Sequence, residues 1–259
     1  MTILRCLVPL FFLSVSLGLA QEAQPALRNE ILLFGEYSGF TDPGRSAHRI
    51  GTLQYYRTLS PGVKVFADVT ATRRFDRTDG SAGAGAYYIP DQSNSFYGFL
   101  AAGFNPEVVP KIDVSLEYTR LIIPRLTASI GYRGLAFSGE TVHMAIPGVT
   151  VYAIPRWTLT GKVFCARLRT DARLRATFLF HAGYDIDETW MPEVYYTLGS
   201  EAFRATSLDL VASQHAWSLT VGGKVQLSDN LRLRLHAMHG VRAGAFEENG
   251  LDCAFSFLW

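Results

Sequence analysis

The chain has 259 residues, of which 18% are charged and 13% aromatic, and its formal net charge at pH 7 is +1. So small a net charge excludes a strongly basic nucleic-acid-binding surface or a polybasic tail. The low charged fraction and high aromatic fraction favour a surface that meets lipid, and the length suits one barrel domain.

The first 20 residues have the organisation of a secretory signal peptide. Residues 1–5 form a short basic start, residues 6–20 are almost wholly apolar, and residues 18–20 are a Gly-Leu-Ala stop before Gln21. The apolar run is shorter than the about 20 residues of a membrane-spanning helix. We therefore expect a signal peptide over 1–20, a short periplasmic segment over 21–29, and a mature chain that is secreted or crosses a membrane by strands.

From residue 30 onward the chain is a series of strands of about ten residues separated by turn residues. In chain order the predicted strands cover 30–40, 46–59, 63–75, 83–89, 95–104, 112–121, 126–137, 141–154, 157–169, 173–184, 193–203, 217–227, 231–241 and 250–259. Pro147-Gly148 predicts a β-bulge, and 76–80, 204–214 and 242–249 are expected to be loops. The tally of fourteen predicts an all-β, transmembrane, antiparallel up-and-down barrel over 30–259. Twelve strands is the alternative, if one weak hairpin fails.

The last strand shows why lipid is the expected solvent. Side chains alternate between the two faces of a strand, so one face carries Leu251, Cys253, Phe255, Phe257 and Trp259, and the other carries Asp252, Ala254, Ser256 and Leu258. In a soluble sandwich, the alternative fold, this strand would be an aggregation-prone edge. It suits the closing strand of an outer-membrane barrel, with Trp259 in an interfacial aromatic girdle and short turns facing the periplasm.

Three short motifs resemble the YaiO family of outer-membrane β-barrel proteins. They are Arg73-Arg74-Phe75-Asp76, then Ala86-Tyr87 followed by Pro90, and Gly131-Tyr132-Arg133-Gly134-Leu135-Ala136-Phe137. Two features depart from the family pattern: the terminal aromatic is Trp259 instead of Phe, and Gly161-Lys162 replaces a more aromatic and basic run. The resemblance implies a barrel in the outer membrane of a Gram-negative bacterium, without an established activity.

Basic residues on the inner face are the candidate binding residues. The strand phases place nine bases and four acids there, and the candidate lumen site is Arg133, Lys162, Arg173, Arg175, Lys224, Arg232, Arg234 and His236. Because charged linings select ions by sign, we expect a pore or binding barrel for small anionic or saccharide solutes. Arg173, Arg175, Arg232 and Arg234 would carry the preference for anions. The alternative is that the charges pair across a closed lumen, as Arg133 or Lys162 could do with Glu117 or Asp113.

Parts of the sequence fit two other functional classes. Ser138, Glu140 and His143 gather near one outer turn and could form a hydrolase or acyltransferase site if Ser and His were paired. Their spacing is not diagnostic, so we predict a non-enzymatic protein without cofactor or metal site. A docking role in envelope or exopolysaccharide export is the alternative function, with the loops 76–80, 203–214 and 242–249 as contact surfaces.

The expected partners follow from the barrel interpretation. They are outer-membrane lipid, the barrel-assembly machinery through the C-terminal strand, and in the docking alternative a periplasmic or polysaccharide partner, with no nucleic acid. Cys165 and Cys253 both fall on outer faces, on strands far apart in order, so we expect two free thiols.

Overall fold

A computed structural model describes residues 29–41, 46–74, 76–152, 154–171, 173–187, 189–199, 216–242 and 246–259. The expected signal peptide, the segment 21–28 and the expected loop 204–214 lie outside the described residues. The described residues include no helix long and apolar enough to span a membrane.

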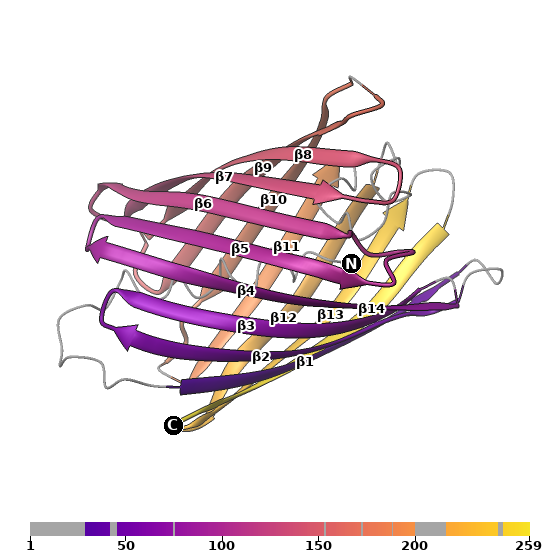
Figure 1. Ribbon diagram of the computed structural model, residues 1–259. Coiled ribbons are helices and arrows are strands. Elements are labelled where there is room, and N and C mark those ends of the chain that lie inside the picture. Colours follow the sequence, from indigo (N-terminus) through magenta and orange to yellow (C-terminus); the bar gives the residue numbers. More distant parts are fainter. Residues whose placement is uncertain are drawn as a thin grey trace.

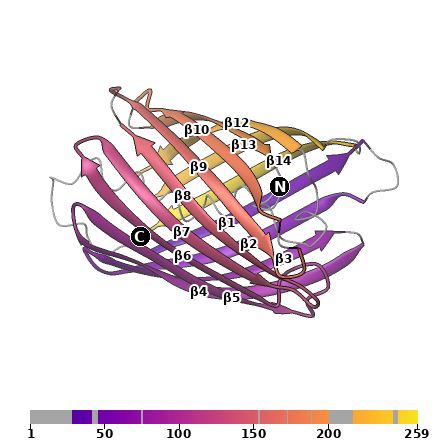
Figure 2. The same cartoon turned by 90° about the horizontal axis from the view of Figure 1, so that it is seen from above.

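Fourteen antiparallel strands form one closed barrel in which β1 pairs with β14 and every other strand pairs with its neighbours in sequence (Figures 1 and 2). The strands are β1 (Asn29–Phe40), β2 (His48–Ser60), β3 (Val63–Arg74), β4 (Arg77–Asp91), β5 (Asn94–Phe104), β6 (Ile112–Ile123), β7 (Leu126–Ala136), β8 (Thr141–Val151), β9 (Trp157–Leu168), β10 (Arg175–Tyr184), β11 (Trp190–Gly199), β12 (Ala216–Ser228), β13 (Leu231–Arg242) and β14 (Phe246–Leu258). Closure removes the exposed sheet edge that the apolar β14 would otherwise present. The predicted up-and-down barrel of fourteen strands is confirmed.

Several predicted boundaries are wrong. The expected loop 76–80 belongs mostly to β4, which runs from Arg77 to Asp91 instead of 83–89, and the expected loop 242–249 overlaps β13 and β14. β11 begins at Trp190 instead of residue 193, and residues 200–203 of the predicted strand lie outside the described residues. In β4 and β14 backbone pairing extends the strand through Gly, Ala or charged residues, because the ladder of an existing neighbour offsets their weak strand propensity.

The predicted bulge at Pro147 is also absent. Ala145 pairs with Cys165 and Gly148 pairs with Lys162, so the register between β8 and β9 is the same on both sides of the proline. Pro147 lies opposite Ile130 in β7. Register shifts occur instead beside the short turns, between β2 and β3, β4 and β5, β6 and β7, and β12 and β13.

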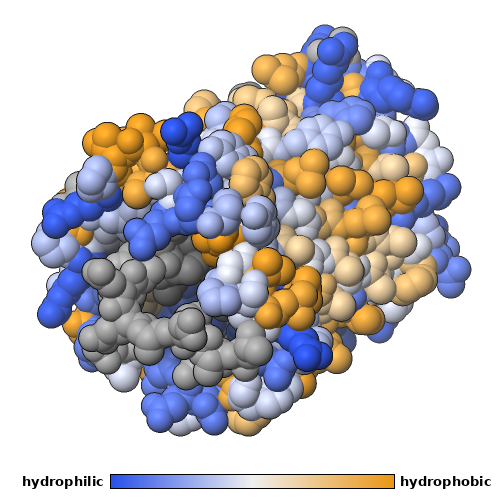
Figure 3. Space-filling model, turned by 60° about the vertical axis from the view of Figure 1, so that its left-hand side comes forward, coloured by the Kyte–Doolittle hydropathy of each residue, from blue (hydrophilic) through white to orange (hydrophobic). Residues whose placement is uncertain are grey.

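The outer wall is apolar, as the alternation predicts. Leu33, Val69, Leu100, Leu116 and Leu251 are each more than half exposed, and Figure 3 shows apolar side chains over the wall with hydrophilic ones gathered toward its ends. Outward-facing aromatic residues collect near the end with the short turns: Tyr55, Tyr88, Phe96, Tyr118, Trp157, Tyr184, Phe257 and Trp259. This belt is typical of a membrane interface, and the short turns mark that end as periplasmic.

Two buried carboxylates fasten the loops at the opposite, outer end. Asp79 accepts hydrogen bonds from the backbone N–H groups of three consecutive residues of the β5–β6 loop, 107–109, with a distance of 2.8 Å from the nitrogen of Val109. Glu140, in the β7–β8 loop, accepts from the backbone of Arg169 at 3.0 Å and from the hydroxyl of Thr170. These contacts hold two loops at the outer mouth.

Candidate functional site

The inward faces of the strands carry the candidate site, and they are only partly polar. One buried apolar cluster on β7 to β11 consists of Leu135, Val142, Met144, Ile146, Phe164, Ala166, Leu168, Leu179 and Tyr195. A second, on β1 to β5 and β14, consists of Leu32, Phe34, Ile50, Tyr56, Phe66, Tyr87, Tyr97 and Ala254, with Phe99 packed against it. The expectation of a polar inner face is corrected here, because much of this barrel's interior is filled by its own apolar side chains.

Phe66 is the centre of the second cluster. Its ring stacks with Tyr97 and Phe99 at centroid distances of 6.1 and 5.7 Å, and it is tilted against Tyr56 and Tyr87 at 5.2 and 5.6 Å. One continuous aromatic wall therefore faces the lumen from the four neighbouring strands β2 to β5.

The Gly/Ala-rich strand β4 makes room for these rings. Gly83 and Gly85 face the lumen, where a Cβ atom on Gly83 would come within 2.6 Å of the Phe99 ring. A Cβ atom on Gly85 would collide with the ring of Phe66 and with the backbone of Gly98. The two glycines let the aromatic rings of β3 and β5 lie against the wall.

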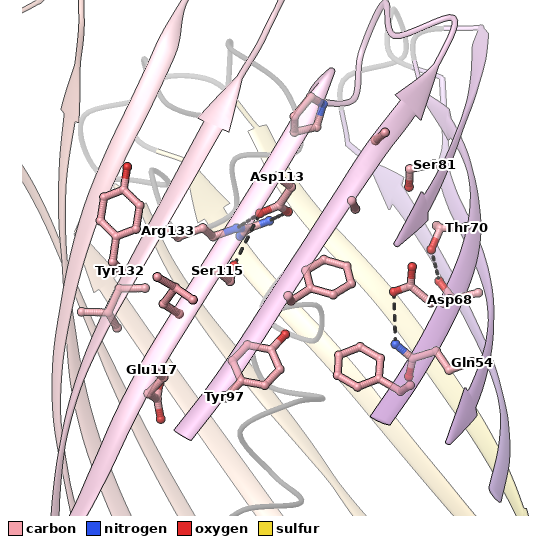
Figure 4. Close-up of a pocket in the computed structure, with 18 of the residues that line it drawn as sticks. Gln54, Asp68, Thr70, Ser81, Tyr97, Asp113, Ser115, Glu117, Tyr132 and Arg133 are labelled. Atoms are coloured by element: carbon pink, nitrogen blue, oxygen red, sulfur yellow. Dashed lines mark hydrogen bonds and ion pairs between the residues drawn. The ribbon is translucent and has the colours of Figure 1, made fainter. Parts of the chain in front are cut away.

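A cavity of about 90 Å³ lies on this aromatic wall (Figure 4). Phe66, Tyr97 and Phe99 line one part of it. Its polar lining comprises Thr52, Gln54, Asp68, Thr70, Ser81, Asp113, Ser115, Glu117 and Arg133. Gln54 donates a 3.4 Å hydrogen bond to Asp68, and the hydroxyls of Thr52 and Thr70 are 3.0 Å apart. The cavity thus joins flat apolar rings to a set of hydrogen-bonding groups.

The charges beside this cavity are paired. Arg133 binds Asp113 through two hydrogen bonds, Nε to Oδ1 at 3.1 Å and Nη2 to Oδ2 at 2.6 Å. The ammonium of Lys162 lies 2.9 Å from a carboxylate oxygen of Glu117. These are two of the pairings that the closed-lumen alternative names, so Arg133 and Lys162 are not free cations.

A larger cavity of about 240 Å³ lies at the periplasmic end. Its basic lining residues are Lys224, Arg232 and Arg234. The β10–β11 turn supplies Asp187, whose carboxylate accepts hydrogen bonds from the Thr189 hydroxyl and from backbone N–H groups of that turn. These bonds hold the pKa of Asp187 below its usual value.

A chain of buried polar groups lies beside this cavity. Glu193 forms an ion pair with Lys224 at 2.9 Å and accepts hydrogen bonds from the Tyr195 hydroxyl at 2.9 Å and from His236 at 3.2 Å. The other ring nitrogen of His236 lies 3.0 Å from Asp252. Residues of β11, β12, β13 and β14 are thereby tied together inside the lumen.

The structure distributes the eight predicted lumen residues along the barrel, with Arg133 and Lys162 in the ion pairs beside the aromatic cavity. Lys224, Arg232, Arg234 and His236 share the periplasmic end, whereas Arg175 begins β10 at the outer end and pairs with Asp171 at 2.9 Å. Arg173 precedes that strand and is exposed. The prediction that Arg173 and Arg175 act together with Arg232 and Arg234 is therefore not supported by their positions, because the length of the strands separates them.

Five inward carboxylates were missed by the sequence analysis: Glu30, Glu36, Asp79, Glu193 and Glu248, all nearly fully buried. They remove the predicted excess of bases. Glu30 and Glu36 lie in phase with Ser38 on a recognised strand, so the alternation of 30–40 could have found them. Asp79 and Glu248 lay in segments interpreted as loops, and Glu193 lay in the least regular part of the sequence.

The residues weighed for catalysis do not converge. Ser138 donates to a backbone carbonyl in the β5–β6 loop, and His143 faces outward, with its Nδ1 atom 2.7 Å from the Tyr132 hydroxyl. Burial raises the pKa of Glu140, but hydrogen bonds from Thr170 and from backbone N–H groups outweigh it and hold the pKa below its usual value. Glu140 thus fastens a loop, and these three side chains form no Ser–His–acid arrangement.

The cysteines lie as the sequence analysis expects. Cys165 on β9 and Cys253 on β14 are free thiols. Within the described ranges, no group of three or more His, Cys, Asp or Glu side chains is arranged to hold a metal ion.

Comparisons with known proteins identify the family of the barrel domain. A family model described as "YaiO membrane beta barrel domain" matches residues 28–196. No curated protein sequence matches the chain.

Solved structures of outer-membrane proteins resemble the fold. Omp33 of Acinetobacter baumannii matches with a TM-score of 0.55 and 10% identity, over 89% of this chain and 99% of that chain. A bacterial polysaccharide outer membrane secretin has a TM-score of 0.58 and 10% identity, over 89% and 98% of the two chains. The monoaromatic hydrocarbon channel CymD has a TM-score of 0.58 and 8% identity, over 91% and 88%. At these identities the likeness establishes the barrel fold alone.

Proposed function

The chain belongs to the YaiO family of membrane β-barrels, and from this premise we propose that it is a non-enzymatic, solute-binding barrel of the outer membrane whose lumen takes small saccharides. The aromatic wall around Phe66 carries the proposal, because it shares a cavity with Gln54 and Asp68. Ligand sites typically combine apolar and aromatic walls with a few placed polar groups. The C–H faces of a sugar ring stack on aromatic rings, and its hydroxyls hydrogen-bond to amide and carboxylate groups.

Charge supports a saccharide over an anion in this cavity. Its one arginine, Arg133, already forms a bidentate pair with Asp113, and two further carboxylates, Asp68 and Glu117, line the same space. An anion would have to displace a buried carboxylate or lie beside one, which costs electrostatic energy. A neutral polyol can use the same oxygens as acceptors.

Titration calorimetry on the protein in a zwitterionic detergent tests this proposal. We expect measurable binding of a neutral mono- or disaccharide, and weaker binding to Phe66→Ala, which removes the central ring. Phe178→Ala is the matched control, since Phe178 faces lipid on β10 and is 44% exposed. The control should bind sugar as the unmodified protein does.

Liposome swelling separates binding from passage. Swelling in isotonic sugar that falls in Phe66→Ala supports a saccharide pathway, whereas binding without swelling supports a closed binding barrel. If neither neutral nor acidic saccharides bind, or if Phe66→Ala and Phe178→Ala behave alike, the saccharide assignment is wrong.

We also propose the maturation and partners that the sequence indicates. Residues 1–20 would be removed as a signal peptide, leaving a short periplasmic segment over 21–29, and β14 would present the chain to the barrel-assembly machinery. N-terminal sequencing of protein extracted from outer membranes tests the cleavage. A docking partner in polysaccharide export, the alternative role, has less loop surface than predicted because 76–80 lies mostly in β4; co-purification from detergent extracts would favour it.

A further inference from the structure

Arg234 is a buried cation whose hydrogen-bonding capacity is largely unused. It faces the lumen from β13 with 8% of its surface exposed. Its Nε and Nη2 atoms are buried and have no hydrogen-bond partner among the described residues. A guanidinium stays charged in proteins, and a buried charge without a hydrogen-bonded partner is strongly unfavourable.

Three carboxylates near this end of the lumen, Glu193, Asp252 and Glu30, each bind a group other than Arg234. Glu193 is held by Lys224, His236 and Tyr195. Asp252 is bonded to His236 at 3.0 Å. Glu30 is bonded through one oxygen to Lys64 at 3.0 Å, and its other oxygen has no hydrogen-bond partner among the described residues. None of these carboxylates therefore supplies the acceptor that Arg234 lacks.

Arg234 lines the cavity of about 240 Å³ at the periplasmic end. The volume exceeds the roughly 30 Å³ that one water occupies in the liquid. On the same lining, Gln226 donates to the Ser228 carbonyl, Thr189 donates to Asp187, and Arg232 donates through Nε to Gln226. Lys224, Ser256 and the terminal nitrogens of Arg232 are further donors there. Asp185 and Asp187 lie on the β10–β11 turn side, and Asp187 is committed to the hydrogen bonds of its own turn.

We propose that the periplasmic end of the lumen holds an anion site in which Arg234 binds a phosphate or carboxylate group, with Arg232 and Lys224 as secondary cations. A guanidinium presents parallel N–H donors that match two oxygens of such a group. Lys224 can contact the anion while it keeps its bond to Glu193, because an ammonium has three donors. This site is separate from the aromatic cavity and does not depend on saccharide binding there.

Inorganic phosphate is the probe, measured by calorimetry on the full mature chain in a zwitterionic detergent. We expect saturable binding that weakens at least tenfold in Arg234→Gln. Arg120→Gln, an exposed arginine on the outer face of β6, should leave the affinity unchanged. Absence of binding to the unmodified protein, or equal affinity in Arg234→Gln, overturns the proposal.

Arg234→Lys keeps the charge and covers the case in which Arg234→Gln does not fold, as judged by heat-dependent migration in gels. A lysine cannot make the bidentate contact, so weaker phosphate binding supports the site and an unchanged affinity refutes it. Nanodiscs of phosphatidylglycerol and of phosphatidylcholine identify the source of the anion. If phosphatidylglycerol alone blocks phosphate binding, the ligand is a lipid headgroup; if neither does, it is a soluble solute.

Discussion

Lys162 on β9 and Glu117 on β6 form an ion pair with Nζ and Oε2 2.9 Å apart, although β7 and β8 separate their strands. Both side chains are nearly buried, with exposed fractions of 5% and 9%. Together with Arg133 and Asp113, they place paired charges within the lumen. The interior at this level is therefore a packed polar network.

Removing one partner of this pair should destabilise the barrel. Glu117→Gln leaves the buried ammonium of Lys162 without its counter-charge, and we expect the free energy of unfolding to fall by about 3 kcal/mol. Denaturant titration in lipid vesicles, followed by tryptophan fluorescence, measures the loss. Arg77→Met breaks an exposed pair with Glu107 and should cost less than about 1 kcal/mol. Equal losses in the two variants would contradict the buried network.

Asp79 should control the β5–β6 loop. Asp79→Ala removes the acceptor of three backbone N–H groups, and the two buried ones, of Val108 and Val109, each cost about 1–3 kcal/mol when left unsatisfied. We expect trypsin to cleave after Lys111, in that loop, at least about tenfold faster, since a tenfold change corresponds to about 1.4 kcal/mol. Mass spectrometry of the fragments measures the rate. Asp171→Ala, on the neighbouring β9–β10 loop, is the control and should leave cleavage at Lys111 unchanged.

The contact between the β7–β8 and β9–β10 loops should weaken in acid. The pKa of Glu140 is lower in the folded protein than its ordinary value of 4.5. Glu140 therefore contributes its full stabilisation when the pH is above its ordinary pKa, and this stabilisation is lost as the pH falls through its lowered pKa in the folded protein. Hydrogen exchange at the amides of Arg169 and Thr170, corrected for intrinsic rates, should rise in acid. In Glu140→Gln exchange should already be raised at neutral pH and should not rise further in acid; wild-type protection that persists unchanged in strong acid would refute this.

Trp259 should assist insertion through its aromatic neighbours. Its ring lies 5.7 Å from Phe257 and 6.3 Å from Tyr55, so it joins β14 to β2 across β1. Trp259→Ala should cost about 1 kcal/mol, typical of lost aromatic contacts, and should reduce the yield of folding into vesicles. Trp259→Phe keeps a ring and should restore most of that yield. A full yield from Trp259→Ala would show that the girdle contact is dispensable.

The sequence predicts the barrel and much of the lumen because several strands alternate cleanly. Asp113, Glu117, Arg133 and Lys162 are all placed inward by their phase, and the structure agrees. The alternation of the strands does not predict which of these four side chains form ion pairs with one another. The pairing of Lys162 with Glu117 depends on the curvature of the wall between β6 and β9, which arises only when the barrel closes.

In strands that are apolar on both faces, the sequence does not show which residues line the lumen. In β5, Phe96 and Tyr97 are both aromatic, yet Phe96 faces outward and Tyr97 lines the aromatic cavity. The same holds for β8, where Met144 and Ile146 are inward and Ala145 is outward. Alternation is visible only where the two faces of a strand differ in polarity, so it cannot identify an apolar lumen lining. The packing of Phe66 against its neighbours shows this lining only in the folded barrel.

The Gly/Ala-rich strand β4, which has the weakest strand pattern in the sequence, influences the width of the interior. Gly83 and Gly85 leave two shallow recesses in β4, into which the edges of Phe99 and Phe66 settle. A methyl group at Gly83 would press on the Phe99 ring and the Cβ atom of Ala101, and one at Gly85 would press on the Phe66 ring and the backbone of Gly98. Either substitution would displace an aromatic ring or the strand beside it. A protein engineer who wished to narrow or block this lumen would therefore start with substitutions at Gly83 and Gly85, and would not need to change a loop or a charged residue.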